Sequence, residues 1–449
     1  MGTLTQALID RAGPADLAMH AMGTSSVPEQ LGGVLVLDTH GRFDLAAARD
    51  LLAQRVSTIE RLCQRLRRAP PLCGYPVWVD DAGFDPIRHI RHVECPAPGD
   101  EAALLDIAAD VLARRLPEDR PGWAAVFVTG LEHERAALIF VIDHVLVDGI
   151  GGVLALARLV DPGFGQPAAE FPRPAPSRRD LFLDAQRRRG RAVAQFARKL
   201  RRRKPRSERP SIAGFRTARA QPCSLLQPTS SRRKLAVVRS DVGALRNAAH
   251  ARGGTINDAY LAAVTGALHE LLRTRGESVP GIQAGVPIAA PVARARTTLD
   301  NRTVPVSVTL PGPSPIDERM QSISATMRTE KNRVSSGSVP ALVALIFEFI
   351  ARVGLYDWYA KRQHQIHTVM SNVPGPPDRL RFAGFPIVDL VPLSVGGGGN
   401  VTVAFIALSY AGTMTSVIVA DPATTPDLRV LAEALQSEYD AIVARRDTV

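Results

Sequence analysis

The stretch FVIDHVLVDGIGG, residues 140–152, begins like a strand and ends like a glycine-rich turn, with polar residues where the two meet. Apolar, β-branched and aromatic residues fill 136–142, which is typical of a buried strand, and the glycines that follow Asp148 end it. Because side chains alternate along a strand, His144 shares a face with every second apolar residue before it, whereas Asp143 points to the opposite face. A lone histidine at such a position is more often a hydrogen-bonded core residue than a catalyst. The motifs around His144 therefore have to decide its role.

Size and composition describe a soluble globular protein. The 449 residues suffice for two domains with cores of ordinary size, and 45% hydrophobic with 22% charged residues excludes collagen-like and disordered chains. The cysteines show no C-x-x-C pair and no disulfide-like density, which indicates reduced thiols inside the cell; they are Cys63, Cys73, Cys95 and Cys223. We expect no secretory signal. The most apolar long stretch, 339–355, is interrupted by Glu348 and Arg352, which predicts a buried or interfacial helix rather than a membrane span.

The positive charge is concentrated in one segment. The formal net charge is +11, and residues 173–234 hold 20 Lys and Arg against 3 acidic residues, so the rest of the chain is mildly acidic. A partial apolar stripe runs beside the arginines of this segment, at Leu183, Val193, Phe196 and Leu200. This pattern is typical of a helix on an anionic membrane surface, and a solvated linker is the alternative. Nucleic-acid binding is disfavoured because the sequence lacks aromatic interleaving and a recognisable nucleic-acid module.

Three regions follow from these patterns. Residues 1–162 alternate strand-like and helix-like stretches, residues 163–233 form a basic, proline-containing crossover, and residues 234–449 form a second mixed domain. In the first region we expect helices over 46–66 and 101–116.

Local signals predict individual elements near the candidate site. Strands beginning at Ala124 and Ala136 form a hairpin that leads into His144. Thr255 and Asp258 form a capping-box pattern, which predicts a helix over 256–275. Further strand-like stretches, bounded by proline and glycine, cover 303–311, 367–377 and 400–412.

A series of short motifs carries a resemblance to a known family. D-H-V-L-V-D-G at 143–149 differs by one residue from HHxxxDG, the signature of coenzyme A-dependent acyltransferases and of the condensation domains of peptide synthetases. Other features appear in the order expected of the bacterial wax ester synthase/diacylglycerol acyltransferase family. NVPGP at 372–376 matches one of its motifs as it stands, and four further stretches resemble its other motifs: Pro121-Gly122-Trp123, Asn257-Asp258, NRTVPVSVTLP at 301–311 and SYAG at 409–412. The resemblance spans nearly the whole chain.

The resemblance implies an α+β fold of two chloramphenicol acetyltransferase-like domains, each a mixed sheet flanked by helices, joined by the crossover. The active site would be a tunnel at their interface, which acyl-CoA enters from one face and the alcohol from the other. Acyl-CoA would be a cosubstrate, with no metal or other cofactor. The expected acceptor is diacylglycerol, with long-chain alcohols as a further possibility. We expect a cytoplasmic protein, peripherally associated with the inner face of the plasma membrane or with lipid droplets through its crossover.

His144 is the expected general base. An alcohol is a poor nucleophile at neutral pH, and neutral imidazole can take its proton as it attacks the thioester and return that proton to the departing coenzyme A sulfur. No acyl-enzyme is required, and the four cysteines have no visible activating context. Asp148 could be a triad partner, but in the superfamily that the chain resembles this aspartate turns away and holds the loop, so we favour a structural role. Gly149 allows a tight turn and close substrate approach.

The remaining candidate residues have weaker signals. The resemblance places Asn257 and Asp258 near the active site as supporting residues, although helix capping alone explains Asp258. Ser371 or Asn372 would donate to the developing oxyanion or line the tunnel, and a rigid bend between strands is the alternative.

Two residues depart from the family's pattern. Asp143 replaces the first histidine of HHxxxDG, and Gly122 replaces the leucine of the PLW motif. Because Asp143 is predicted to point away from His144, the base survives the change. A catalytically silent lipid-binding homologue is one alternative function, and a stand-alone condensation-type acyltransferase that serves a carrier protein is another.

Overall fold

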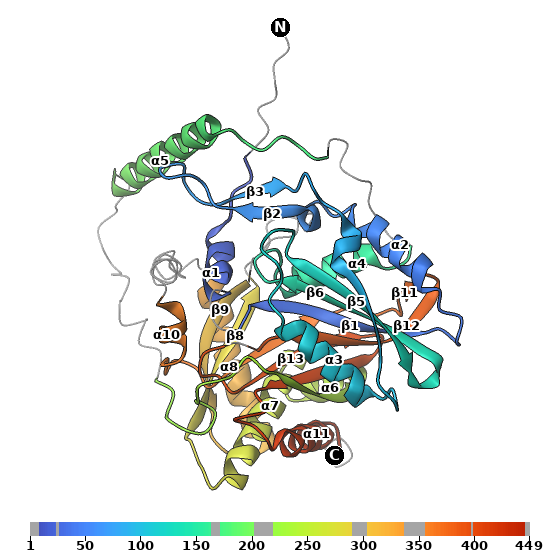
Figure 1. Ribbon diagram of the computed structural model, residues 1–449. Helices are drawn as coiled ribbons and strands as arrows, with labels where there is room; N and C mark the ends of the chain where they lie inside the picture. Colours follow the sequence, from blue (N-terminus) through green and yellow to red (C-terminus); the bar gives the residue numbers. More distant parts are fainter. Residues whose placement is uncertain are drawn as a thin grey trace.

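The computed structural model describes residues 9–23, 27–162, 171–201, 219–289, 303–335, 355–396 and 398–444. Two six-stranded sheets, each flanked by helices, form the body of the molecule (Figure 1). This arrangement confirms the predicted α+β fold of two mixed sheets. Within the described residues, no helix combines the length and the apolarity needed to cross a bilayer. The helix expected over 339–355 lies almost entirely outside the described residues.

The first sheet has the strand order β11-β12-β1-β6-β5-β4. Its strands are β1 (Gln30–Asp38), β4 (Ile90–Glu94), β5 (Trp123–Leu131), β6 (Arg135–Asp143), β11 (Arg381–Phe382) and β12 (Phe385–Ser394). Neighbouring strands are antiparallel except for β4 and β5. Two of the six strands come from the second half of the chain, so the sheet crosses the predicted division between residues 1–162 and 234–449. The division of the chain into separate domains at these boundaries stays a prediction.

β6 is the central strand for the site, and its side chains alternate as predicted. Leu138, Phe140 and Ile142 join an apolar core with α2 (Leu45–Val56) and α4 (Gly149–Leu159). Ile139 and Val141 face the opposite core, against α3 (Glu101–Ala113). The predicted hairpin is also confirmed, because β5 and β6 pair antiparallel across the short turn η3 (Glu132–Glu134).

The second sheet has the order β7-β14-β13-β10-β8-β9. Its strands are β7 (Lys234–Asp241), β8 (Gly281–Ala289), β9 (Thr303–Pro311), β10 (Thr368–Pro374), β13 (Val403–Tyr410) and β14 (Thr413–Ala420). β10 runs parallel to both of its neighbours, whereas the other pairs are antiparallel. The helices of this half are α6 (Val242–Ala251), α7 (Ile256–Thr274), α8 (Ile316–Ser335), α10 (Tyr356–Ala360) and α11 (Leu428–Ala444).

The two halves share one apolar core. Leu104 and Leu105 of α3 belong to the same cluster as Leu393 of β12 and Val417 of β14. Burying an apolar side chain of this size stabilises the folded state by about 1.5–3 kcal/mol. The cluster therefore holds the two sheets together near the end of β6.

One predicted helix is wrong in its second half. The helix expected over 46–66 ends at Val56, and the chain continues through η1 (Glu60–Cys63) into β2 (Gln64–Arg67), which pairs with β3 (Val77–Asp80). The Ser57 hydroxyl donates to the carbonyl of Ala53, which closes the last turn of α2. The remaining elements are the short helices α1 (Pro14–Met22) and η2 (Pro86–His89) and the long helix α5 (Arg178–Arg201).

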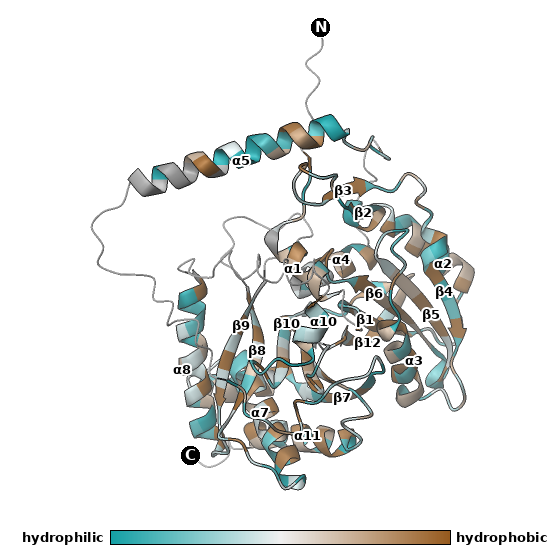
Figure 2. Ribbon diagram, turned by 60° about the vertical axis from the view of Figure 1, so that its left-hand side comes forward, coloured by the Kyte–Doolittle hydropathy of each residue, from teal (hydrophilic) through white to brown (hydrophobic). Residues whose placement is uncertain are grey.

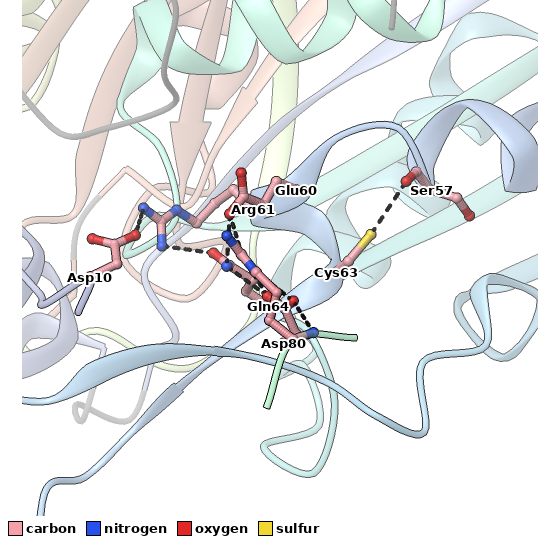
Figure 3. A network of polar contacts seen from close by, with 8 residues as sticks. Asp10, Ser57, Glu60, Arg61, Cys63, Gln64 and Asp80 are labelled. Atoms are coloured by element: carbon pink, nitrogen blue, oxygen red, sulfur yellow. Dashed lines mark hydrogen bonds and ion pairs between the residues drawn. The ribbon is translucent and has the colours of Figure 1, made fainter. Parts of the chain in front are cut away.

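The crossover is tied to the β2–β3 ribbon by ion pairs. Arg173 donates to Asp80 at 2.7 Å and also to Glu60. Both acceptors belong to the polar network of Figure 3, in which the side-chain amide of Gln64 also donates to Asp80. The Arg11 guanidinium donates to Asp184 at 2.6 Å. Beyond these contacts α5 lies on the outside of the molecule in both ribbon views (Figures 1 and 2).

Candidate active site

The turn after β6 is built from local hydrogen bonds. The Asp143 carboxylate accepts from the backbone N–H of Val145 at 2.9 Å, and its carbonyl accepts from Leu146 at 3.0 Å. His144 follows the last residue of the strand and is partly buried, and its backbone N–H donates to the carbonyl of Glu29 at 3.0 Å. The backbone at His144 is therefore held both by its own turn and by the chain that enters β1.

Asp148 begins α4. It is fully buried, and its Oδ1 accepts from the backbone N–H of Gly151 at 2.8 Å, the contact of a helix N-cap. Its carbonyl accepts from Gly152 at 2.7 Å. Asp148 thus fixes where the turn ends and the helix starts, through backbone contacts.

Gly149 joins the turn to the second half of the chain. A Cβ atom at this position would lie 3.0 Å from Cγ2 of Val373, in the NVPGP motif of β10. That distance is tighter than ordinary van der Waals contact, so the absence of a side chain lets α4 approach β10. Two motifs that are far apart in the sequence therefore touch here.

β10 also carries Ser371 and Asn372. Alternation along the strand places Ser371 on the same face as Val373, and hence on the face that meets Gly149, whereas Asn372 shares a face with the buried Met370. The N–H of Gly375 donates to the Ser409 hydroxyl at 3.2 Å, which links NVPGP to SYAG on β13. Of the two oxyanion candidates, Ser371 is thus the one on the face of β10 that meets α4.

Asn257 and Asp258 lie in the first turn of α7. Asp258 is buried, and its Oδ2 accepts from both the backbone N–H and the hydroxyl of Thr255, at 2.8 and 2.9 Å, so the predicted capping box is confirmed. Its Oδ1 is buried and has no hydrogen-bond partner among the described residues. Asn257 is partly buried. Tyr260, one turn further along, has its hydroxyl near the backbone of Ser371, and burial raises the pKa of this phenol well above its ordinary value.

The structure therefore brings several predicted site elements around one strand. β10 contacts both α4 and α7, which carry the residues that follow His144 and the Asn257-Asp258 pair. The expected tunnel stays a prediction. Two hollows of about 520 and 620 Å³ in the described part of the chain are lined by residues of the second half, and neither lining includes a motif residue.

Sequence reasoning missed a group of charged residues beside the turn. Burial raises the pKa of Glu29 to about 7, Arg233 opposes this rise, and Asp143 adds to it. Burial likewise raises the pKa of Asp143. Arg233 is buried, and its guanidinium donates to the carbonyls of Val395, Ser230 and Arg232. Glu29 lies far from Asp143 and His144 in the sequence, and the pairing of Gln30 with Asp143 between β1 and β6 brings it beside them.

Comparison with known proteins agrees with the motifs. The wax ester synthase/diacylglycerol acyltransferase catalytic domain matches residues 13–260, and the C-terminal domain of the same family matches residues 301–443. A Mycobacterium tuberculosis protein named probable diacylglycerol O-acyltransferase tgs1 is 30% identical over 413 residues, which cover 88% of this chain and 87% of that protein. The O-acyltransferase WSD of Acinetobacter baylyi is 24% identical over 400 residues, 83% of this chain and 85% of its own.

Solved structures show the same fold. The wax ester synthase/diacylglycerol acyltransferase from Marinobacter aquaeolei superposes with a TM-score of 0.68 at 20% identity, covering 97% of this chain and all of that one. The first condensation domain of the CDA synthetase superposes with a TM-score of 0.61 at 18% identity, covering 98% and 97%. Two matched domains of one family and a relative at 30% identity over most of both chains lead to one conclusion: the chain belongs to the wax ester synthase/diacylglycerol acyltransferase family.

Proposed function

We propose that the chain is an acyl-CoA-dependent O-acyltransferase that esterifies diacylglycerol and also accepts long-chain alcohols, with His144 as the general base. The single observation that carries this proposal is the turn around His144, held by Asp143 and Glu29 on one side and by the Asp148 cap on the other. A base must be held in one place to receive a proton during attack, and this turn supplies that rigidity.

In the reaction, His144 carries one proton from the acceptor hydroxyl to the coenzyme A sulfur, and a carbon–oxygen bond replaces the carbon–sulfur bond of the thioester. His144 takes the proton of the acceptor hydroxyl, and the oxygen forms a bond to the thioester carbonyl carbon. The carbon–sulfur bond then breaks, and the imidazolium returns the proton to the departing sulfur. The Nδ1 atom of His144 is buried, so we assign these transfers to Nε2. Ser371, on the face of β10 that meets Gly149, is our candidate donor to the oxyanion.

The relatives support the choice of substrates. The tgs1 relative is named for diacylglycerol, and the Marinobacter structure is named for both diacylglycerol and wax ester synthesis. The test supplies purified protein with palmitoyl-CoA, dioleoylglycerol and hexadecanol in the same vesicles, and reads products by mass. Triacylglycerol should exceed wax ester. A product made mainly of wax ester would reverse the order of acceptors, and no ester at all would contradict the activity.

We also propose that α5 binds an anionic lipid surface. Leu181 packs against Val77 and Val79 of the β3 strand, and Ala185 is buried as well. Phe182, Leu183 and Val193 are exposed, and α5 is largely hydrophilic with hydrophobic stretches between (Figure 2). Val193 is 68% exposed. Each basic residue near an anionic bilayer contributes on the order of 1 kcal/mol, and salt screens the attraction.

Vesicle flotation tests this surface. The triple variant of α5, in which Arg189, Arg191 and Arg198 become Gln, should lose binding to anionic vesicles at low salt. A control with the exposed residues Arg42, Arg91 and Arg135 changed to Gln alters the net charge equally and should bind like wild type. Equal binding of the two variants would contradict a role for α5 itself.

A further inference from the structure

Glu29 lies directly across the sheet from His144. β1 and β6 pair antiparallel with Gln30 opposite Asp143, and the bond from the His144 N–H to the Glu29 carbonyl extends this ladder by one residue. Residues directly opposite in an antiparallel pair have Cβ atoms about 4.5–5.5 Å apart and share a face of the sheet. Glu29 and His144 are therefore cross-strand neighbours.

The side chains around the pair agree on which face this is. The amide of Gln30 donates to the carbonyl of Leu112 at 2.6 Å, so Gln30 points toward α3. Leu31 and Ile142 join the opposite core, with α2 and α4. Alternation then places Glu29 on the face of Leu31, and His144 on the face of Ile142, which is the same face.

Three ionisable side chains lie within electrostatic reach of the Glu29 carboxyl. Arg233, from the segment before β7, favours its ionised form, and Asp143 at the end of β6 opposes it. Tyr356 of α10 is buried and lies within electrostatic reach. Because Arg233 is held by three backbone carbonyls, its positive charge is fixed in place. Burial raises the pKa of Glu29 to about 7, so the carboxyl changes its charge in the pH range where a histidine works.

We infer that Glu29 is a positioning residue for the acyltransfer reaction: its carboxylate, across the strand pair from His144, stabilises the imidazolium that forms when His144 takes the acceptor proton. This role rests on the proposed function of His144. A carboxylate within about 4–6 Å of a basic group favours the charged form of that group by 1–3 pKa units. The stabilisation is present when Glu29 is ionised and is lost when Glu29 is protonated.

The experiment compares kcat and KM across pH for wild type, Glu29→Gln and Glu29→Asp, with palmitoyl-CoA and dioleoylglycerol. Glu29→Gln keeps the shape of the side chain and removes its charge. Its kcat should match wild type near pH 6, where Glu29 is protonated, and fall roughly tenfold below wild type near pH 8, with KM for both substrates unchanged. Glu29→Asp should recover part of the activity near pH 8. Glu134→Gln, at the far end of the same strand pair, is the matched control and should follow wild type.

The outcomes distinguish a failure of the Glu29 role from a failure of the proposed acyltransferase function. If Glu29→Gln lowers kcat equally at all pH values, the role of Glu29 is merely structural and the inference is overturned. A kcat–pH profile identical to that of wild type would overturn it too. If the wild-type protein turns over substrate, neither of these two results for Glu29→Gln contradicts the acyltransferase activity. A wild-type protein without turnover would overturn the proposed function and this role with it.

Discussion

Gly122 and Asp143, the two residues that depart from the family's motifs, lie against each other. A Cβ atom at Gly122 would be 3.0 Å from Cβ of Asp143 and 3.1 Å from Cδ1 of Leu146, and the Asp143 N–H donates to the Gly122 carbonyl at 2.8 Å. The two departures therefore share one site behind the turn that carries His144. Glycine at 122 leaves room for the turn that the Asp143 carboxylate closes.

Gly122→Ala should destabilise the protein, because the added methyl group would press on Asp143 and Leu146. Overpacking of this kind lowers the free energy of unfolding by about 1–3 kcal/mol. Urea denaturation of Gly122→Ala and wild type measures this difference. Gly190→Ala is the control, since a Cβ at Gly190 meets no atom of the described residues within 4 Å. Equal stability of the two variants would contradict the close packing at Gly122.

Gly149 and Val373 should be energetically coupled. Gly149→Ala brings a methyl group against Val373 and should lower both stability and kcat, whereas Val373→Ala should relieve that contact. A double-mutant cycle on the free energy of unfolding should give an interaction energy of about 0.5–3 kcal/mol for residues in contact. Additive effects would mean that α4 and β10 do not meet at this point.

Asp148 offers a test between a cap and a catalytic partner. Asp148→Ala should lose about 0.5–2 kcal/mol of stability, because the N-cap contact to Gly151 disappears. Asp148→Asn keeps a good cap and should retain most of the wild-type kcat. If Asp148 instead oriented His144 as a triad member, the Asn variant would lose about 10⁴ in kcat, which would contradict our assignment.

Glu29 should also make stability depend on pH. Its pKa is raised from 4.5 to about 7 in the folded protein, so the folded state holds this proton more tightly than the unfolded state does. The contribution of the protonated Glu29 to the free energy of unfolding is fully present below the unfolded pKa of 4.5 and is lost as the pH rises through about 7. The loss is on the order of 3 kcal/mol at most. Glu29→Gln should therefore be more stable than wild type near pH 8 but not near pH 4, in urea titrations at each pH. Parallel pH curves for the two proteins would contradict this burial.

Local signals in the sequence predicted the elements whose cause is local. The strand over 136–142, its hairpin and the α7 capping box follow from alternation, turn chemistry and side-chain capping, which act within a few residues. The helix over 46–66 failed because its second half pairs as β2 with β3, a tertiary contact that overrides helical propensity.

The parts of the site that could not be predicted depend on distant pairing. Neither the entry of β12 into the first sheet nor the position of Glu29 opposite His144 has a signature in nearby residues, because strand register is set by the whole sheet. The motif resemblance identified His144 and the residues of NVPGP. The contact between Gly149 and Val373 became visible only once the strands were in place.

The kcat of His144→Ala tests the central claim most directly. General-base catalysis contributes typically about 10² to 10⁴ in rate, so this variant should lose at least about 99% of its turnover with palmitoyl-CoA and dioleoylglycerol. Its circular dichroism and unfolding midpoint should match wild type, and Asp143→Ala should lose less, because its carboxylate acts on the turn and not on the acceptor proton. A folded His144→Ala protein with kcat within a factor of about two of wild type would contradict the assignment of His144 as the base.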